Sequence, residues 1–496
     1  MKNRLLILTI CLIATIKMMA QEFTLHGKVV DENNQPLEFA IVSVASQGKT
    51  AVTSLKGDYS LKLHSADSVV VKFSYIGFKT KTKVLRRPRG KQTLQVVLRE
   101  ASTNLDEVNI KGEKIQSDQI QELKTKDRVD AAIKSHVAAI MDIPGFNYRS
   151  NLYQKAYKAL PQQVVLGSET ASTVSSRGVY KFPVERKAGA KYDDHQSSSY
   201  DVEHCSWSDL PEYNFILSED LPYDMGEFVW TGFDYLGEPT PYYDDWPSHS
   251  SLFGIIDLAY LPKDRYYLYR SQWNKAAETL HILPHWNWPG REGEVTPVFV
   301  YTNYPTVELF INGKSQGKRT KDTTVKLDET ENDEARRALA RQKRYRLMWM
   351  DTRYEPGEVK AVAYDESGRK RTEQIVRTAG KPYRIVLKAD KDTLDADLRD
   401  EDLAFVTVSV VDREGNLCPD AQHTVKFSVR GAGYYKAGAN GNPVCLEPFG
   451  RPQMPVFNGQ MTAIVAEKGQ AGTLRLKAEA KGLKSAELVL AVKRTE

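Results

Sequence analysis

Two long stretches of short, evenly spaced apolar runs enclose a middle segment with a different pattern, and this contrast limits what the chain can fold into. Residues 23–98 and 295–494 alternate apolar and polar positions and break at turn clusters, as β-sandwiches do. In the middle segment, apolar runs that we expect to form strands lie at 136–143, 164–166 and 227–230. They alternate with stretches of helical spacing at 153–160 and 264–273. Strand–helix alternation of this kind favours parallel β/α units.

The length of 496 residues is too great for one compact domain, so we expect several. A complete (β/α)8 barrel needs about 250 residues. The middle segment therefore suffices for only about three of the eight units. The predicted fold is multidomain, with boundaries at 1–20 (signal peptide), 21–100 (N-terminal β-sandwich), 101–135 (junction), 136–294 (partial barrel), 295–380 (β-sandwich) and 381–496 (C-terminal immunoglobulin-like β-sandwich).

The N-terminus has the pattern of an export signal. Lys2 and Arg4 precede an apolar run from Leu5 to Ile16, and the small residue Ala20 ends the segment. Cleavage after Ala20 would lower the formal net charge from +5 to +2, which gives no reason to expect nucleic acid as a partner. We expect an exported protein, periplasmic or associated with the outer membrane.

Cysteine usage indicates neither a disulfide framework nor a metal site. Three cysteines follow the signal, and of these Cys418 and Cys445 could pair in an oxidising compartment, which leaves Cys205 free. No Cys/His spacing resembles a zinc site, so the sequence predicts no metal and no cofactor.

The stretch VVLGSETASTVSSRGVY (164–180) carries the clearest chemical signal. An apolar strand ends in Gly-Ser, and Glu169 follows where the strand meets its loop. In β/α barrels the carboxyl ends of strands point side chains into the active site. A carboxylate there suits nucleophilic attack on an anomeric carbon, although the pattern alone fits a surface loop glutamate as well.

Residues 22–112 resemble the carboxypeptidase-regulatory-like domain. The phrases GKVVDENNQPLEFAIVSV, KGDYSLKL and VKFSYIGFKT carry this resemblance, and LDEVNIKG (105–112) looks like the segment that follows the domain in TonB-dependent receptors. This sandwich serves as a spacer or docking module in many settings, so the resemblance implies a fold more than a function.

Residues 136–496 resemble glycoside hydrolase family 2, chiefly its β-galactosidase-like members. DIPGFNY (142–148) looks like the sixth barrel strand of that family and its loop, LGSETASTVSSRG (166–178) like the seventh, and MGEFVWTGFDYLGEPTPY (225–242) like the eighth. HILPHWNWPG and VYTNYPTVELFINGKSQG look like the link to the sandwich domains and the start of the next domain. The motifs occur in the order of the family.

The resemblance assigns roles to three residues. Glu169 matches the nucleophile, which forms a covalent glycosyl-enzyme intermediate with retention of configuration. Tyr148 matches a tyrosine that hydrogen-bonds the nucleophile; a buried loop tyrosine is the alternative. Trp230 matches an aromatic residue that walls the sugar subsite; a barrel-core tryptophan is the alternative.

A retaining glycosidase also needs a second carboxyl group, about 5 Å from the first, as acid/base. In the family this Glu follows an Asn at the end of strand four, and the chain contains no Asn-Glu pair. The sequence therefore predicts a β-galactosidase-like retaining hydrolase acting on a carbohydrate, with impaired activity. The alternative is a non-catalytic exported fusion protein that binds glycan, an envelope component or a partner chain.

Three other groups of residues could be mistaken for sites. Asp257 is expected to make structural hydrogen bonds. The residues His281, His285, Trp286 and Trp288 are expected to pack between domains, and the charged segment 335–346 to form a solvated helix.

Overall fold

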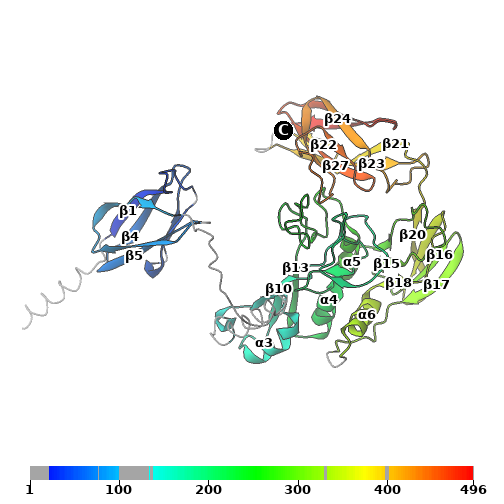
Figure 1. Cartoon of the computed structure of the whole chain (residues 1–496), viewed down its shortest axis with the longest axis horizontal. Helices are drawn as coiled ribbons and strands as arrows, with labels where there is room; N and C mark the ends of the chain where they lie inside the picture. Colours follow the sequence, from blue (N-terminus) through cyan, green and yellow to red (C-terminus); the bar gives the residue numbers. More distant parts are fainter. Residues whose placement is uncertain are drawn as a thin grey trace, which may run out of the picture. The chain divides into compact units, whose positions relative to one another are not determined.

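The computed structural model describes residues 22–38, 40–47, 49–75, 78–99, 133, 138–328, 332–396 and 401–494. The chain divides into two compact units, Met1–Lys114 and Ile115–Glu496 (Figure 1). The predicted signal peptide and most of the predicted junction lie outside the described residues. Within the described residues, no helix has the length and apolar character needed to cross a lipid bilayer.

The first unit is a sandwich of two four-stranded sheets. Alternating burial along its strands places apolar side chains such as Leu25, Val42 and Phe73 in one core between the sheets. One sheet holds β4 (Asp58–His64), β1 (Glu22–Val30), β7 (Gly90–Thr93) and β8 (Val96–Val97); the other holds β3 (Lys49–Val52), β2 (Ile41–Val44), β5 (Ser68–Ser74) and β6 (Lys81–Arg86).

The second unit begins with a three-stranded parallel sheet in the order β13-β10-β9. Its strands are β9 (Gly145–Asn147), β10 (Val165–Thr170) and β13 (Asp224–Val229), and helices α3 (Tyr153–Ala159), α4 (Pro211–Asp220) and α5 (Asp264–Trp273) accompany them. Between β10 and α4 lie the two-residue strands β11 (Lys187–Ala188) and β12 (Glu203–His204). Parallel pairing brings the carboxyl ends of all three strands to one edge of the sheet.

One sequence-based strand is wrong. Residues 138–140 of the apolar run 136–143 form a 3-10 helix (Ala138–Ile140), and the strand starts later, at Gly145. Ile140 is 84% exposed, so this run does not have the buried alternation of a strand. Pro144 then precedes the strand, and proline restricts the residue before it to extended conformations.

The sheets that follow are antiparallel except at one pair, where the strand at Thr393–Asp395 runs parallel to the strand at Ala486–Lys493. The first sheet holds β14 (Leu280–Leu283), β15 (Val298–Thr302) and β18 (Leu347–Trp349). The second sheet holds β17 (Lys314–Thr320), β16 (Thr306–Ile311), β19 (Glu358–Tyr364) and β20 (Lys370–Arg377). The third sheet holds β21 (Arg384–Ala389), β23 (Leu403–Val411), β27 (Gln460–Glu467) and β25 (Gly433–Ala439). The fourth sheet holds β22 (Thr393–Asp395), β29 (Ala486–Lys493), β28 (Gly472–Glu479), β24 (Thr424–Gly431) and β26 (Gln453–Pro455). The described part is thus rich in β-structure and has few helices.

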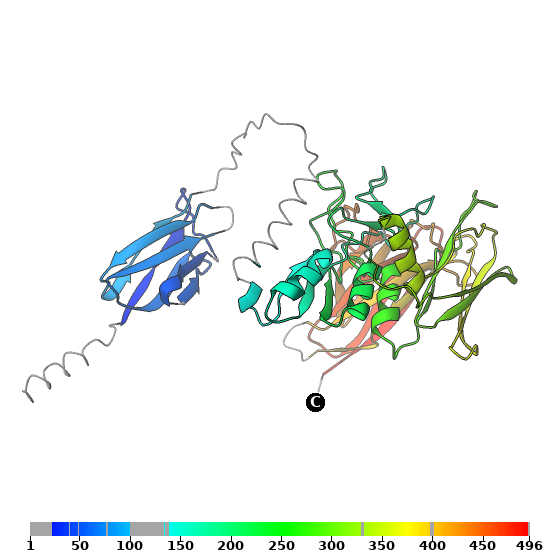
Figure 2. The ribbon, with the colours of Figure 1, turned by 90° about the horizontal axis from the view of Figure 1, so that it is seen from below.

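The charged segment near residue 340 is helical, as expected, but one face is not solvated. Helix α6 (Glu334–Tyr345) packs against α4, and the two helices lie side by side in Figures 1 and 2. Arg344 reaches Glu219 at 2.6 Å and Asp220 at 3.0 Å, and its side chain is only 9% exposed. The arginines on this face therefore bind α4 instead of facing water.

Candidate active site

Glu169 lies near the carboxyl end of β10, and its side chain is half-buried. Its cross-strand neighbour is Asn147, the last residue of β9. Trp230 follows the last residue of β13, and its backbone N–H donates to the Thr170 carbonyl at 2.9 Å. The parallel register therefore brings the neighbourhoods of all three sequence-predicted residues to the same edge of the sheet.

Two side chains donate hydrogen bonds to the Glu169 carboxylate. Asn147 Nδ2 lies 3.1 Å from Glu169 Oε2, and the Tyr148 hydroxyl provides the second bond. Burial raises the pKa of Glu169 and the negative charge of Glu238 raises it further, whereas the two donors lower it. The net pKa is above the ordinary value, so burial outweighs the hydrogen bonds.

Tyr148 is held beside Glu169 by its backbone and by its side chain. Its backbone N–H donates to the Glu169 carbonyl at 2.9 Å, and its φ of 53° lies in the left-handed region. The hydroxyl accepts a hydrogen bond from Ser172 Oγ at 2.7 Å. Burial raises the pKa of Tyr148, which keeps the hydroxyl protonated and able to donate.

Trp230 is half-buried at the end of β13, and the peptide bond that follows it is cis. Its ring meets the ring of Tyr235 edge to face, with 5.9 Å between the centroids. It also packs against a small apolar cluster that includes Cys205, Leu252 and Phe253. Trp230 therefore combines packing against this cluster with partial exposure to solvent.

Four further residues surround Glu169 or its immediate partners. Asn147 and Ser172 lie inside the quoted motifs. Ser172 follows Glu169 by three residues, and Asn147 ends the paired strand β9, so their place in the motifs was the available signal. Tyr235 and Glu238 also lie inside a quoted motif (225–242), in the loop after β13, and the Tyr235 hydroxyl donates to the Glu238 carboxylate. No local pattern predicts that this loop turns back toward β10.

Asp257 has the structural role expected of it. It is 1% exposed, accepts a hydrogen bond from Arg177 Nε at 2.6 Å, and accepts two more from the backbone of Ala259 and Leu261. The aromatic residues of the link also pack: His285 stacks on Trp288 with centroids 4.2 Å apart, and Trp286 is fully buried. Burial lowers the pKa of His285 to about 4.

Cys205, Cys418 and Cys445 are all free thiols, so the suggested Cys418–Cys445 pair is not formed. Cys445 Sγ instead lies 3.7 Å from Met454 Sδ. Over the described residues, no three His, Cys, Asp or Glu side chains form a group that could hold a metal ion.

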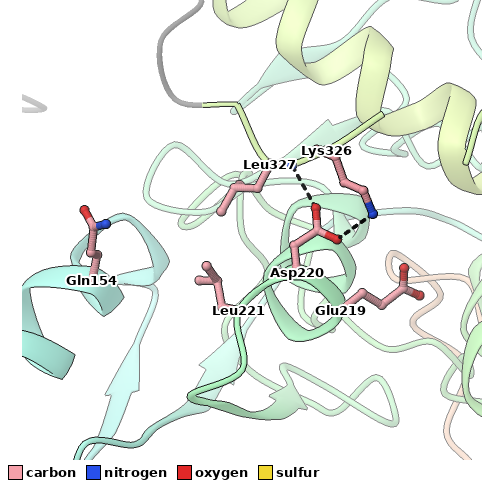
Figure 3. Close-up of a pocket in the computed structure, with 6 residues that line it drawn as sticks. All are labelled: Gln154, Glu219, Asp220, Leu221, Lys326 and Leu327. Carbon is pink, nitrogen blue, oxygen red and sulfur yellow. Dashed lines mark hydrogen bonds and ion pairs between the residues drawn. The ribbon is translucent and has the colours of Figure 1, made fainter. Parts of the chain in front are cut away.

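A surface pocket lies away from Glu169, at the end of α4 that leads into the start of β13 (Figure 3). It is lined by Gln154, Glu219, Asp220, Leu221, Lys326 and Leu327. Asp220 accepts from the Leu327 backbone at 2.8 Å and pairs with Lys326 at 3.6 Å as well as with Arg344. The Glu219 and Asp220 carboxylates are thus paired with basic side chains of this chain. None of the sequence-predicted site residues lines this pocket.

Comparison with known proteins identifies the class. A CarboxypepD_reg-like domain matches residues 25–110, a domain of unknown function (DUF4982) matches residues 293–372, and the glycoside hydrolase family 2 C-terminal domain 5 matches residues 385–489. The chain thus carries the C-terminal part of a family 2 glycoside hydrolase behind a carboxypeptidase-regulatory-like domain.

Its relatives are β-galactosidases and β-glucuronidases. A β-galactosidase of Bacteroides ovatus is 38% identical over 360 residues, covering 71% of this chain and 39% of that protein. A putative β-glucuronidase of Formosa agariphila is 34% identical over 229 residues, covering 46% of this chain and 20% of that protein. The chain therefore spans well under half the length of these two relatives.

Solved structures agree with this class. A β-glycosidase from Bacteroides vulgatus superimposes with a TM-score of 0.59 at 25% identity, covering 76% of this chain and 49% of that one. A family 2 glycosyl hydrolase from Bacteroides cellulosilyticus gives a TM-score of 0.53 at 25% identity, covering 71% of this chain and 42% of that one.

Proposed function

We propose that Glu169 is the nucleophile of a retaining, β-galactosidase-like glycoside hydrolase. The observation that carries this proposal is a half-buried carboxylate near the carboxyl end of a parallel strand, with hydrogen bonds from Asn147 and Tyr148. Such donors favour the ionised form that attacks an anomeric carbon, and they hold its oxygens in one orientation. Trp230, at the end of the next strand, walls the sugar subsite with its apolar face.

In this proposal the β9-β10-β13 sheet corresponds to strands six to eight of a (β/α)8 barrel. The strands are parallel and follow one another in sequence order, with helices between them. The sheets at 280–377 and 384–493 correspond to the two sandwich domains, the second of them immunoglobulin-like.

We also propose that this chain is impaired in its chemistry. The acid/base glutamate of the family follows an asparagine, and the chain has no Asn-Glu pair. Loss of a general acid/base costs about 10²–10⁴-fold in each step that needs proton transfer. A leaving group that departs without protonation would avoid the loss in the step that forms the glycosyl-enzyme. A nucleophile that needs no base would avoid the loss in the step that breaks it down.

The test therefore compares substrates of different reactivity. We expect 2,4-dinitrophenyl β-galactoside to be cleaved and phenyl β-galactoside to be cleaved at least about 100-fold more slowly, with azide accelerating turnover of the activated substrate. Glu169→Gln should abolish all turnover, whereas Glu366→Gln, a change at an exposed glutamate in the later β region, should not. Absence of turnover in well-folded wild-type protein would contradict the proposal, as would turnover that survives Glu169→Gln.

The second candidate is a non-catalytic exported protein that binds glycan or an envelope partner. The match of residues 25–110 to a CarboxypepD_reg-like domain favours it, because such domains act as docking modules in many settings. Glycan binding without turnover, unchanged in Glu169→Gln, would support this candidate. Export predicts a mature N-terminus at Gln21, which mass spectrometry of the periplasmic or outer-membrane fraction would detect.

A further inference from the structure

A β-bulge shapes the end of strand β10 beside β9. The parallel register pairs Gly167 with Phe146, and the next pair is Glu169 with Asn147. Ser168 is therefore the extra residue on β10, and an extra residue of this kind redirects side chains. Neighbouring side chains of a regular strand point to opposite faces. Here Ser168 and Glu169 are neighbours in sequence, and both reach the side chain of Asn147.

The Asn147 amide joins these two side chains through its two ends. The Ser168 hydroxyl donates to Asn147 Oδ1 at 2.7 Å, and Asn147 Nδ2 donates to Glu169 Oε2 at 3.1 Å. A carboxylate can only accept hydrogen bonds, so the amide nitrogen must face Glu169 and the amide oxygen must face away from it. The Ser168 hydroxyl supplies a donor to that oxygen and so favours the productive one of the two amide orientations.

The glycine at position 145 gives the Ser168 side chain its space. Gly145 lies on β9, and a Cβ added there would meet Ser168 Oγ at 2.8 Å and Ser168 Cβ at 2.9 Å. Contacts this short require one of the two side chains to move. The glycine on β9 and the bulge on β10 together therefore leave the Ser168 hydroxyl within reach of Asn147.

We propose that Ser168 is a positioning residue for the nucleophile: its hydroxyl fixes the orientation of the Asn147 amide, and the amide holds the Glu169 carboxylate. This inference rests on the proposed function. Ser168 and Asn147 are exposed, so water competes with both bonds in the free protein. A sugar bound against Glu169 would displace that water, and a hydrogen bond is stronger where water is excluded. A carboxylate held in this way turns less freely during attack on the anomeric carbon.

The test measures the rate at which 2,4-dinitrophenyl 2-deoxy-2-fluoro-β-galactoside labels the full chain, followed by intact mass as a function of pH. Ser168→Ala should slow labelling about threefold to tenfold near neutral pH and move the pH midpoint upward, because a less well held carboxylate is more easily protonated. Ser168→Thr keeps the hydroxyl and should stay within about twofold of the wild type. The control Ser367→Ala removes an exposed hydroxyl that donates to Asp365 at 2.6 Å in a turn of the later β region, and it should match the wild type.

A double-mutant cycle separates positioning from a direct contact between Ser168 and the sugar. Asn147→Ala should itself slow labelling about 10-fold, and in that background Ser168→Ala should have no further effect. An equal loss in both backgrounds, or a Ser168→Ala variant that labels like the wild type or slows without a shift of the midpoint, would overturn the positioning role alone. If the wild type is not labelled, the proposed function fails and the positioning role falls with it.

Discussion

The Glu169 carboxyl group experiences two opposing influences on its charge. Burial and the nearby Glu238 raise its pKa, whereas the Tyr148 hydroxyl and the Asn147 amide lower it. A nucleophile must be ionised, so the donors extend the pH range in which the group can attack to lower pH. Ser172 donates a hydrogen bond to the Tyr148 hydroxyl and so acts on Glu169 only through Tyr148.

Tyr148→Phe tests this balance. Removing the hydroxyl takes away a bond to a charged acceptor, so the pKa of Glu169 should rise and the pH midpoint of labelling should move to higher pH. The labelling rate near neutral pH should fall about 10-fold to 100-fold. Tyr260→Phe, whose ring stacks on Phe233 at the surface, is the control and should match the wild type. An unchanged midpoint in Tyr148→Phe would contradict the assigned hydrogen bond.

The sequence predicted Glu169, Tyr148 and Trp230 because each lies in a motif at a strand end, where local pattern and family resemblance coincide. Their proximity in the structure agrees with that prediction, while their roles stay predictions. Glu238 was missed, although it lies in the same motif as Trp230, because its hydrogen bond with Tyr235 and its electrostatic effect on Glu169 depend on how the loop after β13 folds. Such a contact has no periodicity that a sequence displays.

At the scale of elements, the β10–β13 pair carries a buried carboxyl group that takes no part in the proposed chemistry. Glu227 on β13 accepts from Thr170 Oγ1 at 2.5 Å, and burial raises its pKa to about 8. At neutral pH the folded protein therefore holds Glu227 protonated, whereas the unfolded chain does not. The folded state binds the extra proton between the ordinary glutamate pKa and about 8, so stability falls as the pH rises through that window.

Glu227→Gln should remove this pH dependence. Glutamine keeps the shape and has no proton to lose, so the melting temperature at pH 8 should exceed that of the wild type by a few degrees, with little difference near pH 4.5. Thermal unfolding followed by circular dichroism at both pH values measures this. A variant less stable than the wild type at pH 8 would show that the carboxylate is ionised and stabilising.

The α4–α6 contact depends on arginine pairs that the sequence could not reveal. Arg344 is more than 120 residues from its partners Glu219 and Asp220 in sequence. The local pattern of the segment 335–346 therefore predicted a solvated helix. In contrast, α3, α5 and the start of β10 were predicted at nearly their observed bounds, because their spacing is local.

Arg344→Ala should lower the free energy of unfolding by about 3 kcal/mol, because it leaves two acidic side chains near α6 without their main partner. Arg336 on the same helix is the matched control: its side chain is 76% exposed and pairs only locally with Asp333. Arg336→Ala should be close to neutral in urea denaturation. Equal losses for the two variants would contradict the structural role of the buried pair.

At the scale of the whole molecule, the C-terminal sandwich holds the segment that follows Glu169. Arg177 Nη2 donates to the Asn440 carbonyl at 2.8 Å and to the Phe457 carbonyl at 3.1 Å. Asn458 Nδ2 donates in return to the Arg177 carbonyl at 2.6 Å. The loop after β10 is therefore fixed at one end by the strand that carries Glu169 and at the other by a domain more than 260 residues away in sequence.

The most direct test of the account is to find where a sugar becomes attached. The full chain would be treated with 2,4-dinitrophenyl 2-deoxy-2-fluoro-β-galactoside, digested with pepsin at low pH, and mapped by tandem mass spectrometry. We predict one fluorogalactosyl ester, on Glu169, in a peptide that includes residues of the LGSETAS segment. A label on any other carboxylate, or folded protein that stays unlabelled, would contradict the claim that this strand end carries the nucleophile.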